Sequence, residues 1–286
     1  MNRRPSFPAR LELGAPAPAV RSGAPAPGRK TTSAPAAGPG APAPAKTPSP
    51  TAPVAQPRPG AAPPRNGAGG SDTRAVRLRM VHKLAAQGIS DPAVLAALSE
   101  VERHRFVDSA LVNQAYEDTS LPIGLGQTIS KPNVVARMVE LLLGGRREAG
   151  GKLGRVLEIG TGGGYQAAVL ARVAIEVYSI ERLRGLHDRA RDNLRPLRLA
   201  NVHLLFGDGM AGFAKGAPYA GIIAAAGGGA VPEAWIEQLA MGGRIVAPTV
   251  IDGGRQALVV LEKTPRELKR TVLEAVHFVP LKSGIA

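Results

Sequence analysis

The chain has 286 residues, enough for one large domain or two small ones, and a formal net charge of +14. It contains no cysteine, which excludes disulfides and thiolate metal sites and leads us to expect a reducing, cytoplasmic location. No run of about 18 consecutive apolar residues occurs, and no apolar segment follows Arg3 and Arg4, so we expect neither a transmembrane helix nor a secretory signal.

Residues 1–72 differ in composition from the rest of the chain. Of the 26 prolines, 17 lie in residues 1–70, among Ala, Gly and Ser. Such a segment cannot bury enough apolar surface to offset its ordering entropy, so we predict a disordered tail, partly polyproline II. Its nine basic and two acidic residues could attract nucleic acid, anionic membranes or acidic proteins. No aromatic residues alternate with the basic ones, so we expect a solvated tail without a dedicated nucleic-acid or membrane partner.

Two helices are expected at the start of the folded region, which we place at residues 73–286. Apolar residues recur at helical spacing over residues 74–87, and Gly88 ends that pattern. Asp91 followed by proline is typical of an N-cap and first helical position, so we predict a second helix that runs to about Glu100.

Residues 101–131 show no clear periodicity, and we predict a long irregular segment of the kind that often carries function. Pro132 then begins a strongly amphipathic helix, which ends at Gly144. Residues 73–150 are therefore predicted to form a helical cap that includes this irregular segment.

From Arg155 onward, short apolar runs alternate with helical stretches. This order predicts an α/β fold, a Rossmann-like doubly wound and mostly parallel sheet over residues 151–286. The two last runs have no long helix between them and predict a C-terminal antiparallel hairpin. The predicted strands are Val156–Ile159, Val177–Ile180, Val202–Leu205, Tyr219–Ala225, Arg244–Ala247, Gln256–Glu262 and Arg270–Phe278, and the predicted helices are Gln166–Val173 and Leu183–Leu194.

A glycine-rich turn follows the first of these strands. Gly160, Gly162 and Gly164 allow backbone N–H groups to approach a ligand closely, and the positive end of a helix comes next. Acidic residues occur in this strand and after the next two, at Glu158, Glu181 and Asp208. Because the carboxyl ends of parallel strands meet at one edge, these acids should converge on one nucleotide-binding crevice.

The identity of the nucleotide depends on the glycine spacing and on charge. A dinucleotide turn has the pattern G-x-G-x-x-G, and no glycine stands three residues after Gly162. Glu158 would repel a pyrophosphate and attract a cationic sulfonium that carries an amino group. We therefore favour S-adenosylmethionine over NAD; purely structural turns and caps are the alternative.

The run Val156-Leu157-Glu158-Ile159-Gly160-Thr161-Gly162-Gly163-Gly164-Tyr165 resembles the cofactor motif of protein-L-isoaspartate O-methyltransferases, although alone it would indicate only a class I methyltransferase. The segment Leu121–Pro132, which contains Gln127-Thr128-Ile129-Ser130, looks like the acceptor-site loop of that family. Matches at Arg103–Val107 and Phe278–Leu281 extend the resemblance over residues 76–283.

The resemblance implies an enzyme that methylates the free α-carboxylate of L-isoaspartyl residues in damaged proteins and peptides and so begins their repair. It implies Ser130 as the catalytic residue, Gln127, Thr128 and Ile129 as substrate-binding residues, and a cofactor site of Glu158, Gly160, Thr161, Gly162, Glu181, Asp208 and Gly209. On position alone, Ser130 could instead be the N-cap of the helix at Pro132. We expect a monomer without a metal site, since the histidines lack ligand spacing.

The sequence departs from the family pattern at residues 220–229. Ala220 stands where members commonly have Asp, and Ala224-Ala225 where they have Val-Thr. These changes leave two alternatives open: a class I methyltransferase for another carboxylate or small molecule, and a non-catalytic cofactor-binding protein.

Overall fold

The computed structural model describes residues 69–145, 147–148 and 150–286. The chain divides into two units, and the described residues belong to the second, Pro63–Ala286. The predicted disordered tail therefore lies outside the described residues up to position 68.

Three helices precede the sheet, as predicted: α1 (Gly69–Ala86), α2 (Pro92–Glu100) and α3 (Pro132–Leu143). Helix α1 begins before the expected boundary at residue 73. Asp91 caps α2, because its Oδ1 accepts hydrogen bonds from the backbone N–H groups of Ala93 and Val94 at 2.8 and 3.3 Å. The three helices pack on one another, and α3 also packs on the sheet.

The segment predicted to be irregular, residues 101–131, contains regular structure, and that prediction was wrong. It forms two 3₁₀ helices and an antiparallel hairpin: η1 (Arg103–Phe106), η2 (Ser109–Gln114), β1 (Leu121–Gly124) and β2 (Gln127–Ile129). Strands this short show almost no alternation, and Pro122 within β1 argues against a strand, so periodicity could not reveal them. Left-handed backbone at Leu125 and Gly126, with φ of 52° and 69°, closes the hairpin.

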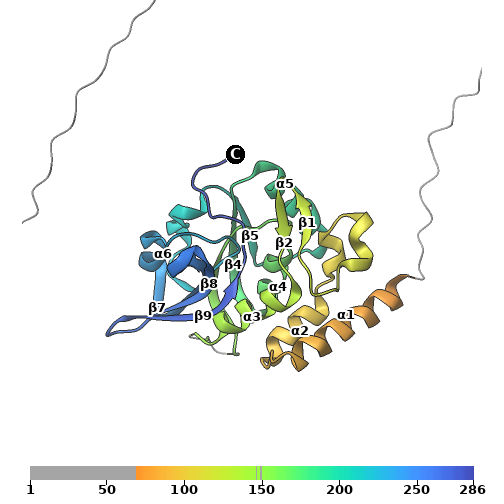
Figure 1. Ribbon diagram of the computed structural model, residues 1–286, viewed down its shortest axis with the longest axis horizontal. Helices are drawn as coiled ribbons and strands as arrows, with labels where there is room; N and C mark the ends of the chain where they lie inside the picture. Colours follow the sequence, from red (N-terminus) through yellow and green to blue (C-terminus); the bar gives the residue numbers. More distant parts are fainter. Residues whose placement is uncertain (1–68, 146, 149) are drawn as a thin grey trace, which may run out of the picture. The chain divides into compact units, whose positions relative to one another are not determined.

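The described region has a seven-stranded sheet in the order β5-β4-β3-β6-β7-β8-β9. Strands β5 to β7 in this order are parallel, and β8 and β9 add an antiparallel hairpin at one end, as predicted. The strands are β3 (Leu153–Ile159), β4 (Ala174–Glu181), β5 (Val202–Phe206), β6 (Tyr219–Ala224), β7 (Leu239–Val250), β8 (Gln256–Lys263) and β9 (Leu268–Val276). Figure 1 shows the β7–β9 end of the sheet opposite the end at which α1 and α2 lie.

Helices cover both faces of the sheet because alternate strand residues point to opposite sides. Val156 and Val177 belong to one core with residues of the cap helices and of the helices that follow β3 and β4. Leu157 and Ile180 belong to the second core, with Trp235. The helices and short 3₁₀ turns of this region are α4 (Tyr165–Val173), α5 (Arg184–Leu194), η3 (Arg195–Leu197), η4 (Gly209–Ala211), η5 (Ala214–Gly216), α6 (Glu233–Gln238) and η6 (Asp252–Gly254).

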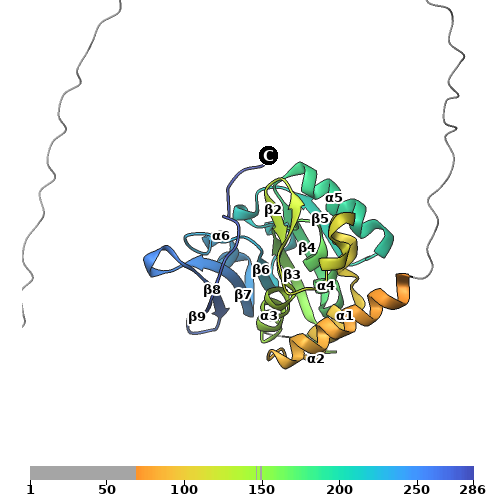
Figure 2. The same ribbon diagram turned by 45° about the vertical axis from the view of Figure 1, so that its right-hand side comes forward.

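Strand β3 lies at the point where the chain order changes direction. Strands β4 and β5 are on one side of it, and β6 and β7 on the other. In doubly wound sheets, ligands bind beyond the carboxyl ends of the strands at such a point. The hairpin β1–β2 lies beside α5 in two views, close to this edge (Figures 1 and 2). No helix in the described part of the chain is long and apolar enough to cross a membrane.

Candidate active site

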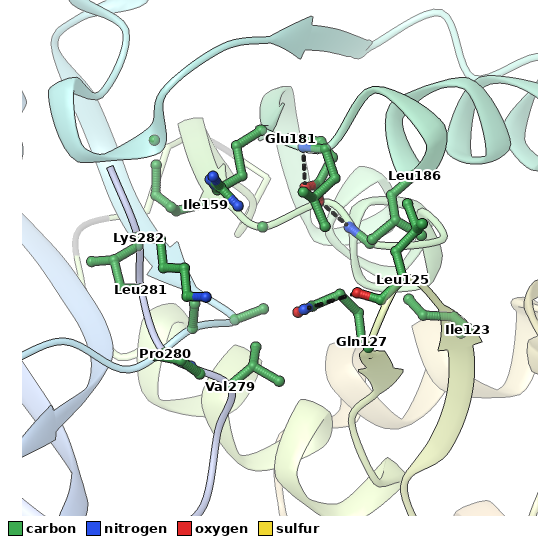
Figure 3. A pocket seen from close by; sticks show the side chains of 18 of the residues that line it. Ile123, Leu125, Gln127, Ile159, Glu181, Leu186, Val279, Pro280, Leu281 and Lys282 are labelled. Carbon is green, nitrogen blue, oxygen red and sulfur yellow. Dashed lines mark hydrogen bonds between the residues drawn. The ribbon is translucent and has the colours of Figure 1, made fainter. Parts of the chain in front are cut away.

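A cavity of about 440 Å³ opens at the carboxyl edge of β3 and β4 (Figure 3). Its size is that of a typical small-ligand pocket. Its walls come from four parts of the chain: the glycine turn, the ends of the strands, the β1–β2 hairpin and the C-terminal segment. Gly160, Gly162 and Glu181 line one side, and Gln127 and Thr128 the other.

The glycine turn is held in place by β4 and by the hairpin. Gly160 and Gly162 have φ of 88° and 56°, a left-handed backbone that glycine adopts without strain. The N–H of Gly160 donates to the carbonyl oxygen of Ile180 at 2.9 Å. A Cβ added at Gly162 would lie 3.1 Å from Cδ1 of Ile123, so the hairpin approaches the turn closely.

Glu181, at the end of β4, is the acidic residue in the wall of the cavity. Its Oε2 accepts a hydrogen bond from the N–H of Gly162 and its Oε1 one from the N–H of Leu183, each at 2.9 Å. The side chain is 4% exposed. Each carboxylate oxygen keeps capacity for a further donor, which suits the ribose hydroxyls expected from the sequence.

Glu158 lies behind the turn and does not line the cavity. Ser179 Oγ donates to Glu158 Oε2, while Oε1 makes no hydrogen bond to any described residue, although the Gln166 amide lies near. Burial raises the pKa of Glu158 to about 8, against the opposing effect of Ser179 and Gln166. Burial therefore favours the neutral form of this carboxyl group, so residue type alone is not an argument for a negative charge that repels pyrophosphate.

Thr161 is buried in the same hydrogen-bonded chain. Its Oγ1 lies 2.6 Å from Ser179 Oγ. Either hydroxyl of this pair can be the donor, and Ser179 links it to the carboxyl group of Glu158. Glu158 and Thr161 therefore fix the shape of the turn, and of the acids expected at the cavity, Glu181 is the one in its wall.

Gly209 lines the cavity beyond β5, whereas Asp208 does not. A Cβ at Gly209 would lie 2.5 Å from Cγ2 of Ile159, so the backbone needs glycine there. Trp235, which is buried in the second core, donates from Nε1 to the Gly209 carbonyl oxygen at 2.8 Å. Asp208 Oδ2 accepts a hydrogen bond at 2.7 Å from the N–H of Gly284 in the C-terminal segment.

Ser130 lies in a small side pocket of about 40 Å³ that shares Gly160, Gly162 and Thr128 with the main cavity. Ile129 lines the same side pocket. Folding thus brings the predicted acceptor loop against the predicted cofactor turn.

The N-cap alternative for Ser130 is wrong. The residue at the N-cap position of α3 is Lys131, and its side chain makes no capping hydrogen bond. Asp118 Oδ1 instead accepts a hydrogen bond from the N–H of Asn133 at 2.9 Å. A residue from another segment therefore satisfies the start of this helix, which leaves the Ser130 hydroxyl free for another role.

Reasoning from the sequence missed the C-terminal wall of the cavity. Residues 279–282 and Arg182 line the cavity on this side. The N–H of Gly227 donates to Val279 O and the N–H of Leu281 donates to Gly227 O, both at 2.8 Å, which fixes the segment against the end of β6. The family match at Phe278–Leu281 was a signal, but its apolar residues suggested no chemistry.

The altered segment at residues 220–229 contributes apolar wall. Ala220 and Ala224 are buried in β6. Ala225 borders both the main cavity and the side pocket, and its N–H donates to Ile159 O at 2.8 Å. Among the described residues, no group of three or more His, Asp or Glu side chains could hold a metal ion.

These features define a class of protein: an α/β enzyme that holds a nucleoside cofactor between a glycine turn and an acid at the end of the second strand. Comparison with known proteins makes the class specific. The family model for protein-L-isoaspartate(D-aspartate) O-methyltransferase matches residues 75–286, and the chain belongs to this family.

Named relatives and solved structures agree with this assignment. The chain is 58% identical over 217 residues to a protein-L-isoaspartate O-methyltransferase of Methylibium petroleiphilum, covering 75% of this chain and 80% of that protein. A relative from Burkholderia mallei with the same name is 55% identical over 221 residues, which cover 77% of this chain and 67% of that protein. A solved protein-L-isoaspartate O-methyltransferase has a TM-score of 0.65 at 30% identity, covering 73% of this chain and 67% of its own.

A structure from Plasmodium falciparum, described as a member of the same family in complex with S-adenosyl-L-homocysteine, has a TM-score of 0.61 at 22% identity. It covers 72% of this chain and 98% of its own, and supports the fold. The predicted fold and family are therefore confirmed. Members of the family use S-adenosylmethionine, which confirms the predicted cofactor.

Proposed function

We propose that the protein transfers a methyl group from S-adenosylmethionine to the free α-carboxylate of L-isoaspartyl residues in damaged proteins and peptides. The methyl ester then cyclises to a succinimide with loss of methanol, water opens the succinimide to aspartyl or isoaspartyl, and repeated rounds restore aspartyl residues. The observation that carries the proposal is the contact between the acceptor loop and the cofactor turn: the hairpin reaches within 3.1 Å of a Cβ built at Gly162. The side pocket with Ser130 opens on the same turn.

The cofactor side of the cavity consists of Gly160, Gly162, Glu181 and Gly209. S-adenosylmethionine supplies an electrophilic methyl group on a sulfonium. Glu181 carries the negative charge in this wall and hydrogen-bond acceptors suited to hydroxyl groups. Behind the wall, Glu158 and Thr161 hold the turn through Ser179, and Asp208 holds the C-terminal segment.

The acceptor side consists of the β1–β2 hairpin and the residue that follows it. A substrate carboxylate is already ionised at neutral pH, so no general base is required. The Ser130 hydroxyl orients this carboxylate by donating a hydrogen bond, and Gln127 and Thr128 form the adjoining wall. Ile129 is buried and anchors the loop, which keeps the hydroxyl in one position.

The test uses labelled S-adenosylmethionine with matched isoaspartyl and aspartyl peptides. The expected result is base-labile label on the isoaspartyl peptide and none on the aspartyl peptide. Label on other carboxylates but not on isoaspartyl would favour another acceptor, for which the apolar wall at Ala225 is the structural argument. Cofactor binding without transfer to any acceptor would indicate a non-catalytic protein. Cytoplasmic location and the monomeric state stay predictions, and light scattering checks the latter.

A further inference from the structure

Lys282 stands in the wall of the cavity, on the side that the C-terminal segment forms. Figure 3 shows its ammonium end and the amide end of Gln127 directed toward each other across the cavity. Gln127 belongs to the acceptor hairpin. Lys282 therefore faces the acceptor side, where the substrate carboxylate must enter.

The backbone around Lys282 is fixed on both sides. Leu281 N–H donates to Gly227 O at 2.8 Å. Gly284 N–H donates to Asp208 Oδ2 at 2.7 Å, and Arg182 Nε donates to the carbonyl oxygen of Gly284 at 2.9 Å. The backbone that carries Lys282 is therefore held in place by hydrogen bonds at the edge of the cavity.

Charge in the cavity is unbalanced on this side. Among the described residues, Lys282 makes no ion pair or side-chain hydrogen bond. Glu181, the acid among the described residues that line the cavity, already accepts hydrogen bonds from Gly162 and Leu183 at the cofactor side. An exposed ammonium without a protein partner at the entrance attracts an anion.

We infer that Lys282 is a specificity-determining residue that draws the isoaspartyl α-carboxylate into the acceptor side of the cavity, opposite Gln127. The inference rests on the proposed function. It assigns Lys282 to the binding of the charged substrate, whereas the methyl ester product, which has lost that charge, is no longer attracted.

The expected kinetic signature follows from the reaction. Negative charge on the carboxylate decreases as its bond to the methyl group forms, so a nearby cation stabilises the bound substrate at least as well as the transition state. Removing the cation should therefore raise KM for the peptide without lowering kcat. Because Lys282 is exposed, the rise in peptide KM should be modest, about 2- to 5-fold, and should depend on salt.

The experiment compares the full-length protein with Lys282→Met, Lys282→Arg and a matched control, Lys215→Met, which removes an exposed lysine that does not line the cavity. Peptide is varied at saturating cofactor, and cofactor at saturating peptide. We expect the peptide KM to rise about 2- to 5-fold in Lys282→Met only, while the KM for S-adenosylmethionine stays unchanged and kcat is not reduced. In the wild type, raising salt from about 0.01 M to about 1 M should raise the peptide KM toward that of Lys282→Met, because the screening length falls about tenfold.

Three outcomes would overturn the inference: an unchanged peptide KM in Lys282→Met, an equal rise in Lys215→Met, or a rise confined to the KM for the cofactor. The last would assign Lys282 to the methyl donor. Absence of transfer by the wild-type protein to any isoaspartyl peptide would overturn both proposals, whereas transfer with an unchanged KM overturns this one alone. Thermal unfolding of each variant shows whether it is folded, and Lys282→Arg should keep the wild-type KM.

Discussion

The two walls of the cavity are built in different ways. On the cofactor side, Gly160, Gly162 and Glu181 belong to the edge of the central sheet and are hydrogen-bonded to neighbouring backbone. On the acceptor side, the hairpin and the C-terminal segment come from outside the sheet and carry exposed side chains, such as Leu125 at 62% exposure. The sheet register fixes the first wall, whereas a few hydrogen bonds hold the second.

This difference separates the effects that substitutions should have. A change in the cofactor wall removes contacts that also stabilise the fold, so cofactor affinity and thermal stability should fall together. A change in the acceptor wall should alter peptide kinetics while the unfolding temperature stays nearly constant. Substitutions on either side therefore test this contrast.

The largest effect is expected for Glu181→Ala. This change leaves the N–H groups of Gly162 and Leu183 without their acceptor and removes the acid in the cavity wall. A hydrogen bond to a charged group contributes about 1.5–3 kcal/mol, so we expect a loss of cofactor affinity of about 100-fold and a lower unfolding temperature. Isothermal titration with S-adenosylmethionine and thermal unfolding measure the two effects.

The control is Glu176→Ala, on the same strand but paired at the surface with Arg155 and His203. It should leave cofactor affinity within about twofold. Equal losses in both variants would show that the strand, rather than the Glu181 carboxylate, sets the affinity, and would remove the basis for the contrast.

A smaller loss is expected for Ser130→Ala, on the acceptor side. One hydroxyl donor to the substrate carboxylate disappears, and a hydrogen bond to a charged group contributes about 1.5–3 kcal/mol, so kcat/KM for an isoaspartyl peptide should fall about 10- to 100-fold. Because Asp118 satisfies the start of α3, the unfolding temperature should stay within about 1–2 °C of the wild type. If instead stability fell while kcat/KM stayed constant, Ser130 would be a structural residue.

The sequence predicts the cofactor wall of the cavity better than the acceptor wall. The alternation of strands and helices and the glycine turn at Gly160–Gly164 predicted the cofactor side, because a sheet edge collects residues at known places in each strand. The hairpin at residues 121–129 is too short for its alternation to show. The position of residues 279–282 depends on pairing with Gly227, a contact between distant segments that no local pattern encodes.

The position of an acidic residue at the end of a strand does not by itself determine its chemical role. Glu158 and Asp208 were predicted correctly to lie at strand ends, but neither lines the cavity. The residue type predicts a negative charge at position 158, whereas burial of Glu158 favours the neutral carboxyl group. Such an effect depends on the packing of Ser179 and Gln166 around the carboxyl group and has no sequence pattern of its own.

The stability of the protein should depend on pH through Glu158. Burial raises the pKa of Glu158 to about 8, above its usual 4.5, so the native state keeps a proton that the unfolded chain loses in this interval. Stability from this group is complete below about pH 4.5 and is lost as pH rises toward about 8. In Glu158→Gln the dependence of the unfolding temperature on pH should be flatter between about pH 5 and about pH 8.

Glu140→Gln is the matched control for this experiment. Desolvation opposes the shift, but hydrogen bonds from Ser90, Asp91 and Arg137 lower the pKa of Glu140, so its titration lies below the interval tested, and none of these partners is a histidine. This variant should keep the wild-type slope. An identical slope in wild type and Glu158→Gln would mean that Glu158 is ionised in the native state, and its negative charge could then contribute to cofactor binding from behind the turn.

The smallest effect is expected where one hydrogen bond ties the acceptor hairpin to the rest of the protein. Arg189 on α5 donates from Nη1 to the carbonyl oxygen of Ile123 at 2.7 Å, and Ile123 is the residue that meets the glycine turn. Arg189→Met removes this bond, worth about 1 kcal/mol, and should raise the peptide KM about 2- to 5-fold with little change in cofactor affinity. Arg191→Met is the control, because Arg191 on the same helix pairs at the surface with Asp188 and should change neither constant. A loss of cofactor affinity in Arg189→Met would show instead that the hairpin supports the turn through Ile123, so that the two walls act as one unit.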